Sequence, residues 1–325
     1  MASRYQLLQL LADGRFHSGD QLGVHLGVGR GAIWKTVRAV RAMGVDVFAL
    51  RGKGYRLAAP MDLLDAERIR EQLHPQARPL LGEFEVLPEI DSTNNHLLRL
   101  AVQRPGSGHS CFAESQSQGR GRRGRTWISP FGANIYFSVL WRFPRPPEAM
   151  QGLSLAVGVA VADALEAAGV PGVGVKWPND IVVNDRKLGG VLMELSGEAT
   201  GPCMVVTGVG INRGMPVAAG TEIDQAWTDL LTLGGTHSDR NTLAAHLLGQ
   251  VLLALGKFAD DGFEPFLKGW MERDATQGRQ IELISENESM VGIAEGVDAS
   301  GALLLSTKSG RRRVLSGEIS LRTTS

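Results

Sequence analysis

The chain has 325 residues, of which 43% are apolar and 21% are charged, and its basic and acidic residues balance. Its two cysteines, Cys111 and Cys203, exclude a secreted fold held by several disulfides, and reduced thiols are typical of the cytoplasm. The first residues do not resemble a signal peptide, and the best candidate for a membrane span, 153–161, is shorter than the ~20 residues that a spanning helix needs. We therefore expect a cytoplasmic globular protein of two or three domains, with no membrane contact.

Positive charge is concentrated in the first 60 residues. This segment carries nine Lys and Arg residues against three acidic residues, a net charge of +6, so the rest of the chain carries −6. A basic segment attached to an acidic body predicts that only the N-terminal segment faces a polyanion.

Residues 1–60 are predicted to form a winged helix-turn-helix domain. Ser18 and Gln21 form a capping-box pattern before the second of three helices, and Gly44 is placed to end the third. A basic turn, 51–54, separates two short strands and predicts a hairpin. The expected elements are helices over 5–12, 19–26 and 30–43 and strands over 45–48 and 55–57.

The third predicted helix has one apolar face and one basic face. A solvated amphipathic helix would show the same pattern, but the glycine turn, the basic hairpin and the local charge favour a DNA-binding helix. The residues expected to contact DNA are Arg30, Trp34, Lys35, Arg38, Arg41 and Lys53.

Residues 61–274 alternate between helical and strand patterns, which predicts an α/β domain with a mixed sheet. The expected helices cover 63–73, 94–102, 153–168 and 242–258, and the expected strands cover 84–90, 110–114, 134–141, 173–177, 181–183, 187–195 and 203–211. Residues 275–325 contain only short strands, expected over 281–284, 290–297, 302–306 and 313–315. We expect this segment to form a small SH3-like β-barrel, so the fold class is multidomain α+β.

The segment Gly119–Arg125, with the sequence GRGRRGR, is the strongest chemical signal. It matches the glycine spacing of a dinucleotide fingerprint, but Pro130 and Gly132 argue against the helix that this fingerprint requires, and no P-loop lysine is present. Glycines let a backbone close over a ligand, and arginines bind phosphate. We interpret the loop as a mobile clamp for a phosphorylated, adenylated intermediate, while nonspecific RNA binding remains an alternative for the loop alone.

Four further polar clusters are candidate parts of a functional site, but each has an ordinary structural explanation when it is taken alone. A surface turn with an ion pair could explain Lys176–Asp180 and 185–190, helix capping could explain Asp91–Asn94, and tight packing could explain the glycines of Gly208–Asn212. The histidines and cysteines show no metal-ligand spacing, and no G-x-S-x-G motif occurs.

Taken in order, these motifs resemble those of biotin protein ligases. The resemblance rests on Asp91–Asn94, Gln116 with the GRGRRGR loop and Trp127, Ser129–Asn134, the KWPND motif at Lys176–Asp180, the DRKLGG motif at 185–190, and Gly210–Asn212. Together with the predicted winged helix, the whole chain is similar to the bacterial bifunctional ligases that also repress the biotin operon.

The resemblance implies a two-step reaction and a second role in repression. Biotin and ATP, with Mg²⁺, would give biotinyl-5′-adenylate, and a lysine of the biotin carboxyl carrier protein of acetyl-CoA carboxylase would then accept the biotin. The adenylate would also act as corepressor, because the family's adenylate-bound form is a homodimer that binds operator DNA.

The resemblance also assigns roles to individual residues. Lys187, Arg122 and Asp180 are expected to be catalytic, and Asp180 is also a candidate ligand for Mg²⁺. The expected biotin-binding residues are Ser92, Thr93, Asn94, Gln116, Arg120, Gly121, Arg122 and Lys187. The expected adenylate-binding residues are Arg125, Trp127, Asn179, Asn212 and Arg322.

A second hypothesis is a winged-helix regulator that senses a phosphorylated effector without turnover. The pairing of Lys187 with Asp180 favours an enzyme, because a sensor does not need charges directed at a carboxyl group that is being activated. Neither hypothesis needs residues 1–60 for catalysis.

Overall fold

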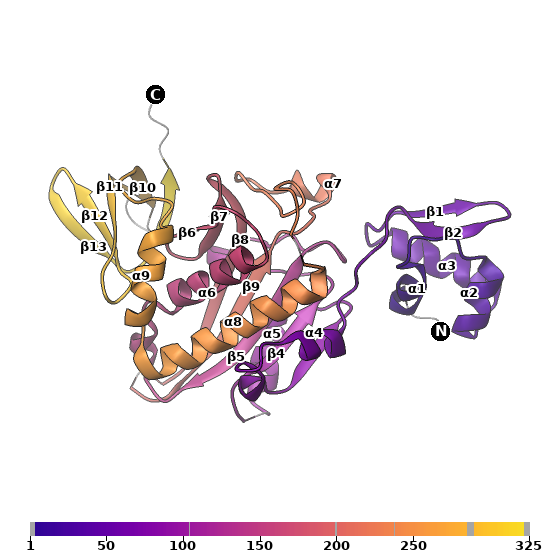
Figure 1. Ribbon diagram of the computed structural model, residues 1–325, viewed down its shortest axis with the longest axis horizontal. Helices are drawn as coiled ribbons and strands as arrows, with labels where there is room; N and C mark the ends of the chain where they lie inside the picture. Colours follow the sequence, from indigo (N-terminus) through magenta and orange to yellow (C-terminus); the bar gives the residue numbers. More distant parts are fainter. Residues whose placement is uncertain (1–3, 104, 199, 237, 285–288, 322–325) are drawn as a thin grey trace.

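The computed structural model describes residues 4–103, 105–198, 200–236, 238–284 and 289–321. It places the N-terminal domain and the C-terminal sheet at opposite ends of a central domain (Figure 1).

The N-terminal domain is a winged helix-turn-helix, as predicted. Its elements are α1 Arg4–Leu11, α2 Gly19–Leu26, α3 Arg30–Arg41, β1 Val47–Leu50 and β2 Gly54–Leu57. The capping box of Ser18 and Gln21 starts α2, and Gly27 ends it in the left-handed conformation. Strands β1 and β2 pair antiparallel to form the wing.

The N-terminal domain packs against the central domain through a small apolar contact. Phe131, which follows the arginine loop, is buried in the same cluster as the core of α1 and α3, with Met61 and Leu63 beside it. Arg4 also contacts Glu89 at 3.0 Å. The winged helix therefore rests on the segment that leads out of the arginine loop.

The central domain is built on a mixed seven-stranded sheet, which confirms the predicted class. The strand order is β3-β4-β5-β9-β8-β7-β6, and only β3 and β4 pair in parallel. The strands are β3 Phe84–Leu87, β4 His109–Ala113, β5 Ile135–Phe143, β6 Gly174–Lys176, β7 Asp180–Val183, β8 Arg186–Gly197 and β9 Cys203–Ile211. The helices are α4 Ala66–Gln72, α5 Thr93–Ala101, α6 Leu153–Ala167, α7 Val217–Gly220, α8 Arg240–Asp261 and α9 Glu264–Arg273.

Helices cover both faces of this sheet. Alternate residues of a strand point to opposite faces, and Phe112 belongs to the main core with α6 and α8 whereas Cys111 packs with Leu97 of α5. Helix α5 therefore lies on the face opposite α6 and α8.

A fully buried ion pair joins the start of α8 to the sheet. Arg240 and Glu114 both have no exposed side-chain surface, and their charged atoms are 2.5 Å apart. Arg240 also donates to the carbonyl oxygens of Asn134 and Asp62, and Glu114 accepts from the backbone of Leu64. The pair therefore ties the segment after the winged helix to β4, β5 and α8.

Two apolar helical segments of the described chain are long enough to cross a membrane by length and composition, 147–167 and Arg240–Asp261. The expectation that the best candidate is too short is therefore wrong by this criterion. However, 67% and 61% of their most apolar windows are buried within the protein, as in the core helices described above.

The C-terminal segment, expected as a small SH3-like β-barrel, is a five-stranded antiparallel sheet that does not close. Its strands are β10 Gln280–Ile284, β11 Ser289–Val297, β12 Leu303–Thr307, β13 Gly310–Val314 and β14 Glu318–Leu321. In the order β13-β12-β11-β10-β14, the strands β13 and β14 are opposite edges. The sheet does not close on itself because its apolar residues, such as Ile281 and Leu305, join the core of the central domain.

Candidate active site

A cleft opens on the central domain between the arginine loop, the start of α5 and strands β7 to β9. Most of the expected site residues line it: Ser92, Thr93, Asn94, Gln116, Arg120, Gly121, Arg122, Arg125, Trp127, Asn179, Asp180 and Lys187. Asn212 lines an adjoining hollow that shares Trp127 and Lys187 with the cleft, and Arg322 is outside the described residues.

The start of α5 carries a buried network of polar side chains. Ser92 is the N-cap residue, so the capping interpretation is correct for this residue. The Thr93 backbone donates to Oε1 of Gln116 at 2.9 Å, and the Ser138 hydroxyl lies 2.7 Å from Thr93 Oγ1 and 2.6 Å from Asn94 Oδ1. These bonds hold the polar groups at the cleft wall in fixed positions.

The arginine loop folds back on itself over the cleft. The Gly121 backbone donates to the carbonyl oxygen of Arg125 at 2.7 Å, and the Trp127 backbone donates to that of Gly119 at 2.9 Å. The tip, Arg122–Gly124, is a single 3₁₀ turn in which Arg123 has a φ of 53°. The loop is thus a narrow hairpin, without the helix that a dinucleotide fingerprint requires.

Protein groups far away in the sequence hold the arginines of this loop. Arg120 donates to both carboxylate oxygens of Glu194, at 2.6 and 2.7 Å. Arg122 donates to the carbonyl oxygen of Gly317, and Arg125 donates to Glu318 at 2.6 Å. Burial lowers the pKa of Arg122. Sequence reasoning missed Glu194 and Glu318 because no local pattern marks a partner so distant along the chain.

Lys187 and Asp180 form a close ion pair inside the cleft. Nζ of Lys187 is 2.6 Å from Oδ1 of Asp180, and both side chains are more than four-fifths buried. The same Nζ lies 5.6 Å from the centre of the Trp127 ring. Lys176 also lines the cleft, and burial lowers the pKa of its ammonium group. The cleft is therefore lined by several cations, as an anionic ligand requires.

Two glycines of β9 make room for side chains of the cleft. A Cβ atom on Gly208 would lie 2.3 Å from Oδ1 of Asn94, and one on Gly210 would lie 2.5 Å from the Trp127 ring. Tight packing against side chains of the protein, the explanation offered for these glycines in the sequence analysis, therefore applies at both positions.

The KWPND motif and Asn212 brace the cleft through the backbone. Asn179 donates its side-chain amide to the carbonyl oxygen of Val191 at 2.8 Å. Asn212 donates to the carbonyl oxygen of Thr228 at 3.1 Å and is buried. Asn212 thus supports the segment that crosses beside Lys187, and these contacts use its amide nitrogen.

The carboxylates of the cleft do not fit a protein-held magnesium ion. Among the described residues that line the cleft, the carboxylates are those of Asp180 and Glu318, and each is within 2.6 Å of a side-chain cation. Mg²⁺ needs several oxygen ligands in octahedral geometry. The expected role of Asp180 as a metal ligand therefore has no support from its contacts.

The predicted DNA-contacting residues lie on the outer face of the winged helix. Arg30, Lys35 and Arg38 of α3 and Lys53 of the wing tip are exposed. Trp34 is 50% exposed, and the guanidinium of Arg38 stacks over its ring at 4.9 Å. Arg41 differs from the others because its guanidinium donates to the carbonyl oxygen of Val47 and joins α3 to the wing.

Comparison with known proteins agrees with each part of this architecture. Residues 3–56 match an HTH domain, residues 86–212 match the biotin/lipoate A/B protein ligase family, and residues 276–322 match the biotin protein ligase C terminal domain.

Two relatives are similar over nearly the whole chain, and a solved structure matches three quarters of it. The bifunctional ligase/repressor BirA of Salmonella typhimurium is 46% identical over 317 residues, which cover 97% of this chain and 96% of that protein. BirA of Escherichia coli is 44% identical, with coverages of 98% and 96%. A solved biotin protein ligase from Aquifex aeolicus, in complex with biotin and ATP, is 30% identical with a TM-score of 0.62 and covers 75% of this chain and 100% of its own. This chain therefore belongs to the family of bifunctional biotin ligase/repressors.

Proposed function

We propose that this protein activates biotin with ATP and transfers it to a lysine of the biotin carboxyl carrier protein of acetyl-CoA carboxylase. In the first step a carboxylate oxygen of biotin attacks the α-phosphorus of ATP and releases pyrophosphate. In the second step the carrier lysine attacks the acyl carbon of the adenylate and releases AMP. The cleft that joins Lys187, Asp180, the arginine loop and Trp127 is the observation that carries this proposal.

Lys187 has the central role in the first step. Biotin carboxylate and ATP phosphates repel each other, and a buried ammonium group offsets the negative charge that gathers between them. Arg122 supplies a second fixed cation, and Arg120, Gly121 and the start of α5 hold the biotin. Trp127 stacks against the adenine.

Asp180 takes part in the second step. In the ligand-free site it neutralises Lys187, and when Lys187 turns to the anionic adenylate the Asp180 carboxylate becomes free to accept a proton from the incoming lysine. Magnesium is expected as the counterion of the ATP phosphates, and the roles given to these residues do not depend on it.

Biotin-dependent exchange of labelled pyrophosphate into ATP tests the proposal directly, because it isolates the first step. Lys187→Ala is expected to lower the exchange rate by about 100-fold or more. Lys268→Ala is the matched control, since that lysine is 87% exposed and should leave exchange unchanged. If a folded protein binds biotin but shows no exchange, the chain is a sensor and not a ligase.

We propose further that the adenylate-bound protein is a homodimer that represses biotin operon transcription in the cytoplasm. Exposed Arg38 on α3 is placed to contact DNA. Binding of the protein to a palindromic fragment of a biotin operon promoter should require biotin and ATP. Arg38→Ala should weaken that binding and leave pyrophosphate exchange intact. DNA binding that is independent of biotin would contradict the corepressor role.

A further inference from the structure

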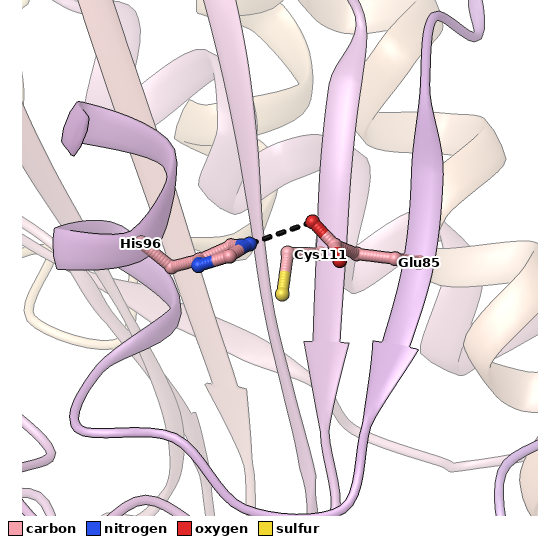
Figure 2. Close-up of side chains that lie close together, drawn as sticks. All are labelled: Glu85, His96 and Cys111. Carbon is pink, nitrogen blue, oxygen red and sulfur yellow. Dashed lines mark hydrogen bonds and ion pairs between the residues drawn. The ribbon is translucent and has the colours of Figure 1, made fainter. Parts of the chain in front are cut away.

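Glu85, His96 and Cys111 converge on one point outside the active-site cleft (Figure 2). Glu85 on β3 and Cys111 on β4 are directly paired in the parallel register, so both side chains leave the same face of the sheet. Helix α5 covers this face and directs His96 toward them. Three different elements therefore bring a carboxylate, an imidazole and a thiol together.

The three groups lie close enough together to bind one ion after small side-chain movements. One potential ligand atom from each of the three side chains lies within 4.8 Å of the other two, and Nε2 of His96 is 2.6 Å from Oε1 of Glu85. Ligand atoms around a tetrahedral zinc ion are roughly 3.3 to 3.7 Å apart. The imidazole and the carboxylate must therefore separate by about 1 Å, which small rotations of the Glu85 side chain allow because it is 36% exposed.

We propose that Glu85, His96 and Cys111 bind one zinc ion, with water as the fourth ligand. Thiolate, imidazole and carboxylate are the three side-chain types that zinc accepts in tetrahedral sites. Cys111 is fully buried, whereas Glu85 and His96 retain exposed surface, so the ion enters from the side of the glutamate. Binding displaces the proton of the Cys111 thiol to solvent, and the ion–thiolate bond replaces the S–H bond.

A zinc ion here would affect the position of α5. His96 lies one turn after Ser92, Thr93 and Asn94, which line the cleft, and Cys111 lies on the strand that leads to Gln116. The ion would therefore clamp the two segments whose polar ends form one cleft wall. The zinc site stands on the geometry of this cluster and does not depend on the proposed ligase activity.

Cobalt provides a direct test, because Co²⁺ occupies tetrahedral zinc sites and a cobalt–thiolate bond gives an intense near-ultraviolet charge-transfer band. The full chain, freed of metal with a chelator, is titrated with Co²⁺ and then with Zn²⁺. We expect the band to reach its limit at one cobalt per chain and to disappear as zinc displaces cobalt. Cys111→Ser should abolish the band, and Glu85→Gln should weaken cobalt binding by at least about tenfold.

Cys203→Ser is the matched control, since this second buried cysteine lies outside the cluster and its loss should leave the band intact. Thermal melting of each variant in chelator reports whether it is folded. The proposal is overturned if the folded wild-type chain shows no thiolate band, if the band persists in Cys111→Ser, or if it is lost in Cys203→Ser. Cobalt bound without a charge-transfer band would place the ion on surface histidines instead.

Discussion

Gly210→Ala should displace Trp127, the residue proposed to stack against the adenine, without unfolding the protein. The added Cβ atom would lie 2.5 to 2.7 Å from three atoms of the Trp127 indole, whereas ordinary contacts begin near 3.4 Å. Strand β9 cannot move away, because Gly210 is paired with Tyr136 on one side and Gly190 on the other. The indole must therefore shift by about 1 Å, and the cleft that Trp127 lines gives it room to do so.

The size of the effect follows from this displacement. A misplacement of about 1 Å in a positioned group lowers catalytic efficiency about 100-fold, which corresponds to ~2.7 kcal/mol of activation free energy. We expect kcat/KM for ATP in pyrophosphate exchange to fall by about this factor, while biotin binding changes much less.

Gly158→Ala is the control for adding a methyl group at a buried glycine. Gly158 lies in helix α6, and the nearest atom to a Cβ there would be a methyl carbon of Val175 at 3.8 Å, so activity should be unchanged and stability unchanged or slightly raised. Equal melting temperatures of Gly210→Ala and wild type would show that the fold is retained. If Gly210→Ala then keeps its kcat/KM for ATP within threefold, the position of Trp127 does not matter for the nucleotide, and this reasoning is refuted.

Three further predictions concern stability and the interdomain contact. Arg240→Met should lower the free energy of unfolding, measured in urea, by about 3 to 5 kcal/mol, because it leaves the buried Glu114 without a cation. Adding Glu114→Gln should recover part of this loss, and equal losses in the single and double variants would contradict the pairing. The Arg99 guanidinium lowers the pKa of Asp91 below its ordinary 3.8, so Asp91→Asn should lower the free energy of unfolding by less than about 1 kcal/mol for this partly exposed pair. This loss should be present above pH 3.8 and shrink as the pH falls below it. A loss of unfolding free energy that is constant with pH would exclude the ionic contribution. A chain of residues 61–325 should retain pyrophosphate exchange but bind biotin more weakly in calorimetry, because it exposes Phe131, which follows the arginine loop that lines the cleft. Unchanged biotin affinity would show that biotin binding does not depend on the winged helix.

The local signals in the sequence were sufficient to predict most of the helices and strands. The Ser18 capping box and the left-handed Gly27 gave α2 its bounds, and the Asn184–Asp185 turn, with φ values of 51° and 60°, gave the β7–β8 hairpin. Helix α9 was missed because Phe263 provides no side-chain cap and Gly269 interrupts its pattern. Strand β14 was missed because it is short and is defined by its pairing with β10, a long-range contact.

In the active site, too, local motifs could be predicted from the sequence and long-range contacts could not. The order of motifs identified nearly all the residues that line the cleft, because each motif is local. It could not identify the groups that hold them: Glu194 is 74 residues from Arg120, and Glu318 is 193 residues from Arg125. Ion pairs of this kind have no periodicity, so they become visible only in the folded chain. The expected barrel failed for a related reason, since the core of the small sheet is shared with the central domain.

The contact between the arginine loop and the final strand has a consequence for how the protein is made. Arg122 bonds to the backbone of Gly317, 195 residues later in the chain, and Arg125 bonds to the neighbouring Glu318. During translation the loop leaves the ribosome long before these partners are synthesised. The nascent chain therefore passes through a stage in which the winged helix and much of the central sheet can form while the arginines still lack these anchors. Full assembly of the cleft wall must wait until residues 317 and 318 have emerged from the ribosome.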